Sequence, residues 1–339
     1  MKKVLTLAFA FVFMTGVAFA QDNTADVEQN GDDMTADVTQ SGLENVADLI
    51  QRNFGGSGHI ASIEQSGERN VADVLSQGDT GVNTVDLEQT GNDNEATIAQ
   101  LWGQNDADVT QTGNDNEVNV QHRGSFNSLA DIEQVGDRNA VDVFDVGQTG
   151  SDPNTDNQAI VSQIGNDNSV LIEQGVFGGA SESVADFTQE GDGNYFETKQ
   201  VRSFNNSVTG TQVGNDNYYR ASVRGSDNTV TMDMIGDANR GSWSIGSLGW
   251  PHQPEGNSLT IDVDGDDNFS TGSIAGDHNT VDITQYGSGN RVGSSWFTSD
   301  GVVIEGNYNT ATISQMGSSD HASIMQMGNS NTATISQSQ

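Results

Sequence analysis

The most frequently repeated chemical group in this sequence is the side-chain amide of Asn and Gln, placed at a fixed distance from Gly. The motif Gly-x-x-Asn occurs sixteen times, and in ten copies a Gln lies two residues before the Gly. An amide carries both hydrogen-bond donors and an acceptor, so identical amides stacked at strand spacing can pair along the stack as a ladder. Such pairing would satisfy polar groups that are costly to bury alone. The sequence therefore predicts structural hydrogen-bond chemistry, in which amides hold repeated strands together.

The sequence contains no motif for catalysis or metal binding that is as regular as the amide repeat. The five His residues are scattered without the paired spacing of a zinc site, and the sequence has no Gly-x-Ser-x-Gly nucleophile motif. We therefore expect no enzyme activity, no cofactor and no structural metal. The main alternative is a calcium-binding β-roll, because Gly-Asn-Asp-Asn turns at Gly91, Gly113, Gly165 and Gly214 offer repeated oxygen ligands. The calcium nonapeptide Gly-Gly-x-Gly-x-Asp does not occur in the sequence, which ranks the β-roll second.

The residues after each Gly-x-x-Asn alternate between two faces, which predicts a β-strand. In the copy Gln89–Gln100, alternate residues from Asn94 onward give one face of amide and small apolar side chains, and the other face is acidic, hydroxyl or small. In five of the six copies that lack the preceding Gln, an aliphatic residue or Met takes its place. A position shared by Gln and apolar residues is expected to be buried. The amide face should therefore line the core, and the acidic face should contact water.

Each Gly-x-x-Asn segment is predicted to be a tight turn, because Gly accepts positive φ and Asn and Asp side chains can bond to their own backbone. Many successive motif Asn residues are 11, 22 or 23 residues apart, so two strands and two turns make a coil of about 22 residues. The predicted fold class is all-β: an amyloid-forming β-solenoid of stacked strand-turn-strand coils, roughly 14 in number.

The predicted site consists of the Gln and Asn positions of the repeat, which would form the ladders and direct assembly, and of the turn glycines. The predicted ladder residues are Gln40, Asn45, Gln51, Gln65, Asn70, Gln89, Asn94, Gln100, Gln111, Asn116, Gln134, Asn139, Gln163, Asn168, Gln174, Gln189, Asn194, Gln212, Asn217, Gln285, Asn290, Gln315, Gln326, Asn331 and Gln337. The predicted turn glycines are Gly91, Gly113, Gly136, Gly165, Gly191, Gly214 and Gly328.

The first residues have the layout of a cleaved secretory signal. Residues 1–20 contain Lys2 and Lys3, an apolar run and the small-residue end Ala18-Phe19-Ala20. Residues 21–339 are then predicted to form one repeat solenoid, with irregular insertions near 240–258 and 292–302, where Trp and Pro interrupt the pattern. We therefore expect an exported protein.

Composition narrows the choice of partners. The chain has a formal net charge of −36, which disfavours nucleic acid because a phosphate backbone requires a basic surface. It contains no Cys, so disulfides cannot stabilise it in an oxidising compartment. After residue 20 no stretch is long and apolar enough to cross a membrane as a helix, so we expect no membrane-spanning segment.

The repeat also resembles a known family. The string Gln-x-Gly-x-x-Asn-x-Ala-x-x-x-Gln is complete at Gln89–Gln100 and Gln326–Gln337, and copies with one or two substitutions occur through most of the chain. It resembles the curlin repeat of curli subunits, the secreted bacterial amyloid of biofilm matrix. The resemblance implies a solenoid whose ladders template subunit addition, giving extracellular fibres for adhesion at the bacterial surface. It implies as partners further copies of the chain, a companion curlin-like subunit and an outer-membrane secretion channel.

The two ends of the predicted solenoid differ in charge. Residues 21–50 contain eight acidic residues, whereas residues 310–339 contain Asp320 as the only acidic residue and no Lys or Arg. Open strand edges at both ends can accept another copy, and this asymmetry predicts a polar fibre whose nearly neutral last coils nucleate assembly. Acidic residues elsewhere would delay assembly. A monomeric solenoid adhesin with closed ends remains an alternative.

Overall fold

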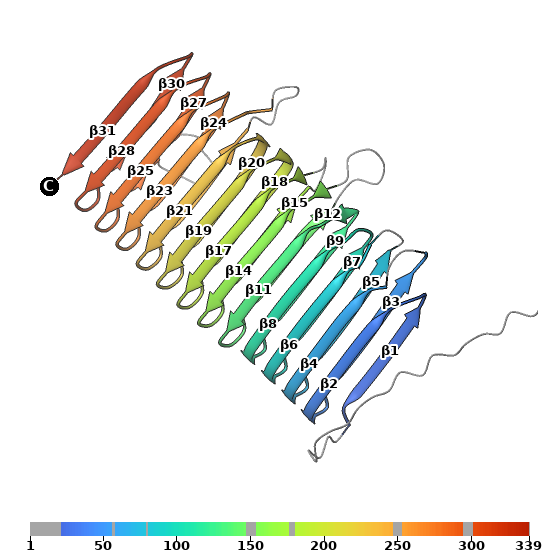
Figure 1. Cartoon of the computed structure of the whole chain (residues 1–339). Coiled ribbons are helices and arrows are strands. Elements are labelled where there is room, and N and C mark those ends of the chain that lie inside the picture. Colours follow the sequence, from blue (N-terminus) through green and yellow to red (C-terminus); the bar gives the residue numbers. More distant parts are fainter. Residues whose placement is uncertain are drawn as a thin grey trace, which may run out of the picture.

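The computed structural model describes residues 22–55, 58–78, 81–146, 154–175, 180–246, 253–293 and 301–338. Every regular element in these residues is a β-strand, and the strands stack in chain order from one end of the molecule to the other (Figure 1). The predicted all-β solenoid is confirmed. The predicted signal segment 1–20 lies outside the described residues, as do residues 247–252 and 294–300 of the two predicted insertions. In the described part, no helix is long and apolar enough to cross a membrane.

One wall of the solenoid, named sheet A, has 13 strands that pair in parallel in sequence order. Its strands are β2 (Thr35–Leu43), β4 (Ile60–Glu68), β6 (Thr84–Asn92), β8 (Asp106–Asn114), β11 (Leu129–Val135), β14 (Gln158–Ile164), β17 (Val184–Glu190), β19 (Ser207–Val213), β21 (Thr229–Ile235), β23 (Ser258–Asp264), β25 (Thr280–Tyr286), β28 (Thr310–Met316) and β31 (Thr332–Ser338).

The opposite wall, named sheet B, is also parallel and has 18 strands, because short segments continue or replace some of the longer ones. Its strands are β1 (Thr24–Asn30), β3 (Val46–Asn53), β5 (Val71–Gly78), β7 (Glu95–Leu101), β9 (Glu117–Arg123), β10 (Ser125–Phe126), β12 (Ala140–Val146), β13 (Asn154–Thr155), β15 (Ser169–Gln174), β16 (Ala180–Ser181), β18 (Tyr195–Phe204), β20 (Tyr218–Ser226), β22 (Arg240–Ile245), β24 (Phe269–Ala275), β26 (Arg291–Val292), β27 (Val302–Glu305), β29 (His321–Ala322) and β30 (Ile324–Met327).

One coil consists of a sheet B strand, a turn, a sheet A strand and a second turn. The 13 strands of sheet A mark 13 coils in the described residues, against the roughly 14 that were expected. Coil length varies: the stacked residues Gln89 and Gln111 are 22 positions apart, whereas Gln134 and Gln163 are 29 apart. In this long coil the extra residues lie between β12 and β14 and include residues 147–153, where the sequence analysis predicted no insertion.

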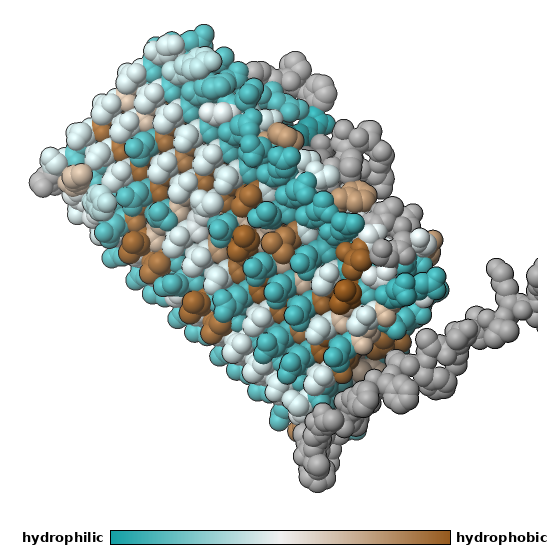
Figure 2. All heavy atoms as spheres, viewed as in Figure 1, coloured by the Kyte–Doolittle hydropathy of each residue, from teal (hydrophilic) through white to brown (hydrophobic). Residues whose placement is uncertain are grey.

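The core lies between the two sheets and follows the period of two. In β11, Ala130, Ile132 and Gln134 are buried, while the residues between them point outward. The same alternation in the other coils forms one continuous apolar cluster along the stack. The face of the molecule seen in Figure 2 carries mainly hydrophilic and intermediate side chains, with scattered apolar ones. The amide face thus lines the core.

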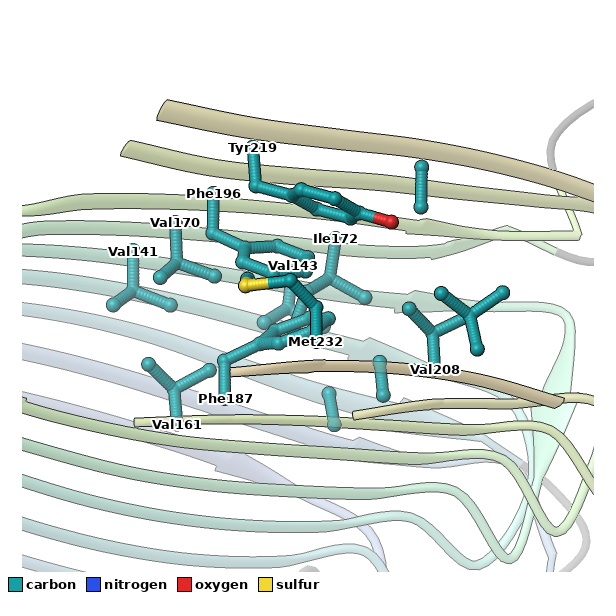
Figure 3. Close-up of a cluster of buried hydrophobic side chains, with 14 of the residues drawn as sticks. Val141, Val143, Val161, Val170, Ile172, Phe187, Phe196, Val208, Tyr219 and Met232 are labelled. Atoms are coloured by element: carbon teal, nitrogen blue, oxygen red, sulfur yellow. The ribbon is translucent and has the colours of Figure 1, made fainter. Parts of the chain in front are cut away.

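Large core residues are accommodated by glycine. Phe187 and Phe196 stack between the sheets with ring centroids 3.6 Å apart, next to Tyr219 (Figure 3). A Cβ on Gly210 would lie 2.6 Å from the Phe196 ring. Within the predicted insertion near 240–258, Arg240–Ile245 forms the regular strand β22, and its Trp243 is only 3% exposed. The Trp243 ring packs against Gly272 of the next coil. A Cβ on Gly272 would lie 2.3 Å from the ring, so the ring occupies the space that a side chain would need.

Candidate assembly site: amide ladders and solenoid ends

The buried Gln residues of sheet A form a chain of hydrogen bonds along the stack, named here the Gln ladder. Each Nε2 donates to the Oε1 of the Gln in the next coil over 2.8–3.0 Å, from Gln40 to Gln212 and again from Gln285 to Gln337. The intermediate members are Gln65, Gln89, Gln111, Gln134, Gln163, Gln189 and Gln315. Met234 and Val263 interrupt the Gln ladder between Gln212 and Gln285.

Each ladder amide also ties the two sheets together. The Nε2 of Gln65 donates to the backbone oxygen of Val46 over 3.0 Å, and Gln89 reaches Val71 in the same way. One side chain thus satisfies both of its donors inside the core, once along the stack and once across it. Because a buried amide without these partners would be costly, the Gln ladder fixes both the register of the coils and the spacing of the sheets.

A second column, named the Asn ladder, lies at the turn that precedes each sheet B strand. The Asn94 Oδ1 accepts the backbone N–H of Asn116 at 3.2 Å and its Nδ2 at 3.0 Å, and the Asn94 Nδ2 donates to the Gly113 oxygen of the next coil at 2.9 Å. The predicted members Asn45, Asn70, Asn139, Asn168, Asn194, Asn217 and Asn290 belong to this column.

The direction of these bonds differs from the prediction that the turn residues bond to their own backbone. For most ladder residues the Nδ2 donates to a glycine carbonyl in the following coil, as from Asn70 to the Gly91 oxygen at 2.9 Å, whereas the Asn239 Nδ2 has no partner among the described residues. Local bonds are present as a minority, as from Asn45 Nδ2 to the Ser41 oxygen at 3.1 Å. The turn amides therefore join coils more than they close turns.

The predicted turn glycines have positive φ, between +97° and +128°. At six of them a Cβ would lie 1.9–2.2 Å from the carbonyl oxygen of the glycine in the next coil: Gly91, Gly113, Gly136, Gly165, Gly191 and Gly214. Stacked corners therefore require glycine for space as well as for conformation. Gly328 lies in the last coil, where a Cβ would meet nothing nearer than 3.8 Å.

Four predicted ladder residues lie on a different column, the inward position of sheet B, and do not contact one another. The Nε2 of Gln51 and Gln326 donates to backbone oxygens of sheet A, at 3.1 and 3.0 Å. Gln100 has Ser76 and His122 as its register neighbours, and Gln174 donates to Gln200 over 3.2 Å. The inward column of sheet B therefore carries short amide pairs, Gln29 with Gln51 and Gln174 with Gln200, rather than a continuous ladder.

A further Asn column lies at the other turn, before nine of the 13 sheet A strands, and sequence reasoning found little of it. Of the predicted residues only Asn331 belongs here; its Nδ2 donates to the Asn309 Oδ1 over 3.0 Å. The missed members are Asn83, Asn105, Asn157, Asn206, Asn228, Asn257, Asn279 and Asn309. The 11-residue spacing of Asn217, Asn228 and Asn239 in the sequence was the signal, because half a coil separates the two turns.

Outward carboxylates also stack in register and repel one another. Asp86, Asp108 and Asp131 occupy one column of sheet A. Partial burial raises the pKa of Asp108, and the neighbouring charges of Asp131 and Asp86 raise it further. Burial and the charge of Asp48 raise the pKa of Asp73 in the same manner on sheet B. Stacking thus has an electrostatic cost that falls when these groups are protonated.

The first and last coils differ from the rest in how they are covered. Five apolar residues pack against the core while still partly exposed: Val27, Ala36, Val38, Ala333 and Ile335. They lie in β1, β2 and β31, the terminal strands of the stack. The last coil also exposes Met325 and Met327. Each end therefore presents an inward-facing apolar row next to unpaired strand edges.

In the described residues, no group of three His, Asp or Glu side chains lies close enough together to hold a metal ion. In each Gly-Asn-Asp-Asn turn the side-chain oxygen of the first Asn accepts a hydrogen bond from a neighbouring coil. The Oδ1 of Asn114, for example, accepts both the backbone N–H and the Nδ2 of Asn92, at 3.1 and 3.0 Å. These corners therefore use their oxygens for stacking.

The sequence was compared with known proteins. The curlin associated repeat matches four segments, residues 31–67, 82–113, 91–121 and 306–338. The first of these covers β2, β3 and all but the last residue of β4, and the last covers β28 to β31. The search of curated proteins gave no match.

Proposed function

We propose that this chain, a member of the curlin-repeat family, is a structural subunit that stacks end to end into extracellular fibres of the curli type. The family is one of structural subunits rather than enzymes. The proposal concerns what the ends of the solenoid do: each end adds the complementary end of another copy, and the ladders and the apolar core continue from one copy into the next.

The observation that carries the proposal is the incomplete burial of the terminal coils. Interior members of the core are at most a few per cent exposed, while its partly buried members in the described residues lie in the first and last coils. A second copy whose β2 stacks on β31 would bury Ala333 and Ile335 under its Ala36 and Val38. Because apolar burial favours association and the strand edges supply backbone hydrogen bonds, both ends favour addition of the same chain.

The family also supports a location and a set of partners. We propose that the protein is exported and functions at the bacterial cell surface or in biofilm matrix, in adhesion. Its partners would be further copies of itself, a companion curlin-like subunit and an outer-membrane secretion channel. The stacked carboxylates, such as Asp108, would slow assembly at neutral pH, so mild acid should accelerate it.

The proposal is tested by diluting residues 21–339 out of denaturant, with and without chelator, while following amyloid-dye fluorescence and fibre diffraction. Dye-positive fibres with a strand spacing of about 4.7 Å, formed equally well in chelator, are the expected result. A soluble monomer that folds only with calcium would move the assignment to a β-roll. A folded monomer that stays soluble in both conditions would make the chain a solenoid with closed ends.

A matched pair of variants locates assembly at the ends. Ile335→Lys places a charge on the inward face of the last strand, where the next copy would stack, whereas Ser336→Lys places it on the outward face of the same strand. We expect Ile335→Lys to suppress fibre formation and Ser336→Lys to leave it close to that of the unmodified chain. Equal rates for the two variants would show that fibres do not grow through this end.

A further inference from the structure

The Asn ladder begins and ends with groups that have no partner in a single copy. It starts at Asn23, whose Oδ1 accepts the backbone N–H of Asn45 at 2.9 Å. It ends at Asp320, whose backbone N–H donates to the Asn290 Oδ1 at 3.0 Å. Among the described residues the Asn23 Nδ2 has no acceptor and the Asp320 Oδ2 has no donor, although both atoms are buried. The two unpaired groups are therefore a donor at one end of a column and an acceptor at the other.

Asp320 is the one member of this column that is not Asn. A carboxylate accepts hydrogen bonds but donates none, so Asp320 cannot repeat the donor role of the Asn residues before it. It is 8% exposed, and it is the only acidic residue between positions 310 and 339. A buried carboxylate oxygen without a donor is costly. This cost is removed if the donors come from another molecule.

We propose that Asp320 is the acceptor for Asn23 of a second copy stacked on the last coil, where the Asn23 backbone N–H and Nδ2 donate to the carboxylate. The inference rests on the proposed end-to-end assembly and names the contact that sets its register. Every step along the Asn ladder has this polarity, since the backbone N–H of the later coil donates to the side-chain oxygen of the earlier one. A hydrogen bond to a carboxylate is also stronger than its neutral equivalent.

The Gln ladder gives the same register independently. Its last member, Gln337, accepts from Gln315 at 3.0 Å, and its first member, Gln40, donates to Gln65 at 2.8 Å. A second copy therefore continues this ladder when Gln337 Nε2 donates to its Gln40 Oε1. Asn23 and Gln40 are 17 residues apart, as are Asp320 and Gln337. One placement of the second copy thus continues both ladders.

Charge favours this placement over the reverse one. In the head-to-tail register, His321 stacks on Thr24 because each follows its ladder residue directly, so Asp26 and Glu28 of the second copy stack on Ser323 and Met325, which are uncharged. Two first coils stacked on each other would instead bring acidic strands together. Like charges at strand spacing repel, so the acidic first coil and the nearly neutral last coil select a polar fibre.

The test measures elongation of short fibre seeds by soluble residues 21–339, with seed and soluble chain of the same sequence: wild type, Asn23→Asp, Asp320→Asn or both. Asn23→Asp puts two carboxylates at the junction, and we expect elongation to slow at least about tenfold. The double variant exchanges the two groups, so the amide at 320 can donate to the carboxylate at 23, and elongation should recover to within about threefold of wild type. Gln104→Glu, an exposed position in the middle of the stack, adds the same charge and should leave the rate unchanged.

The outcomes separate the junction from the proposed function. Wild-type chain that forms no fibres overturns both. Fibres from the wild type, with Asn23→Asp elongating at the wild-type rate, overturn the junction alone. A slow Asn23→Asp variant that Asp320→Asn fails to rescue also overturns it, because Asn23 would then act within its own copy. Circular dichroism of each soluble variant, together with the rescue itself, distinguishes a lost junction from a lost fold.

Discussion

Replacing one interior member of the Gln ladder tests how much a stacked amide contributes to local stability. Gln163 accepts from Gln134 Nε2 at 2.9 Å, and its own Nε2 donates to the Gln189 Oε1 at 2.8 Å and to the Ala140 oxygen at 3.3 Å. Gln163→Met keeps a similar volume and matches the residue that the same column holds at Met234, so the variant should still fold. It removes all three bonds.

The expected cost follows from the groups that are left behind. Gln134 Nε2 keeps its bond to the Glu117 oxygen at 3.2 Å. Among the described residues no other donor bonds to the Gln189 Oε1, so this buried acceptor becomes unpaired. An unpaired buried acceptor costs about 1–3 kcal/mol, and each lost bond contributes about 0.5–1.5 kcal/mol. Allowing for overlap between these terms, we expect a local destabilisation of about 2–4 kcal/mol, or roughly 30-fold to 1000-fold in the opening equilibrium.

Hydrogen exchange followed by mass spectrometry measures this opening coil by coil, which suits a stack whose coils contact mainly their neighbours. Gln158→Met is the matched control, since Gln158 lies on the same strand, β14, and its side chain is exposed. Exchange should accelerate in β14 and β17 for Gln163→Met and stay near wild type for Gln158→Met. If the two variants exchanged alike, the ladder would add nothing to local stability, and the reasoning would be refuted.

Two further experiments probe the corners and the core. Gly136 has a φ of +125° and Gly55 a φ of +137°, so Ala at either position is strained by about 1–3 kcal/mol. Only Gly136→Ala also places a Cβ 1.9 Å from a carbonyl oxygen, that of Gly165. Denaturant unfolding should show Gly136→Ala less stable than Gly55→Ala by about 2 kcal/mol or more, and equal losses would contradict the close stacking. Burial lowers the pKa of His122 to about 4, below its ordinary 6.5, so stability should fall by about 3 kcal/mol as pH drops from 7 to 4. His122→Gln should remove this component, and a stability difference between the two chains that is constant with pH would argue against it.

The sequence predicted the parts of the structure that repeat locally. The alternation from Asn94 to Gln100 fixes which side chains point inward, because a strand has a period of two wherever it occurs. The Gly-x-x-Asn corners follow from the conformational freedom of Gly91 and its equivalents. Solenoid class, inward amides and turn positions therefore required no knowledge of long-range contacts.

The residues that were missed or misplaced depend on which coils stack. Asn83 and Asn105 lie two residues after a Gly rather than three, so the motif did not identify them, although both are buried. Gln51 and Gln100 match the repeat locally, yet coil stacking places Ser76 between them. A coil whose length varies from 22 to 30 residues hides such alignments, because each insertion shifts every later register. The column to which an amide belongs is thus a property of the assembled stack.

The distribution of amides along the inward column of sheet B indicates where amides are required. From Val223 to Ile304 this column is entirely aliphatic, but it starts with Gln29 and ends with Gln326. The Gln ladder of sheet A behaves similarly, since apolar residues interrupt it in the interior while both ends carry Gln. Interior coils tolerate the loss of an amide because the neighbouring coils already hold the register through apolar packing and backbone bonds. A terminal coil must select its partner from solution, and there an amide adds a directional requirement that apolar burial lacks. We therefore expect substitutions of terminal amides to affect assembly more than stability, and those of interior amides to do the reverse.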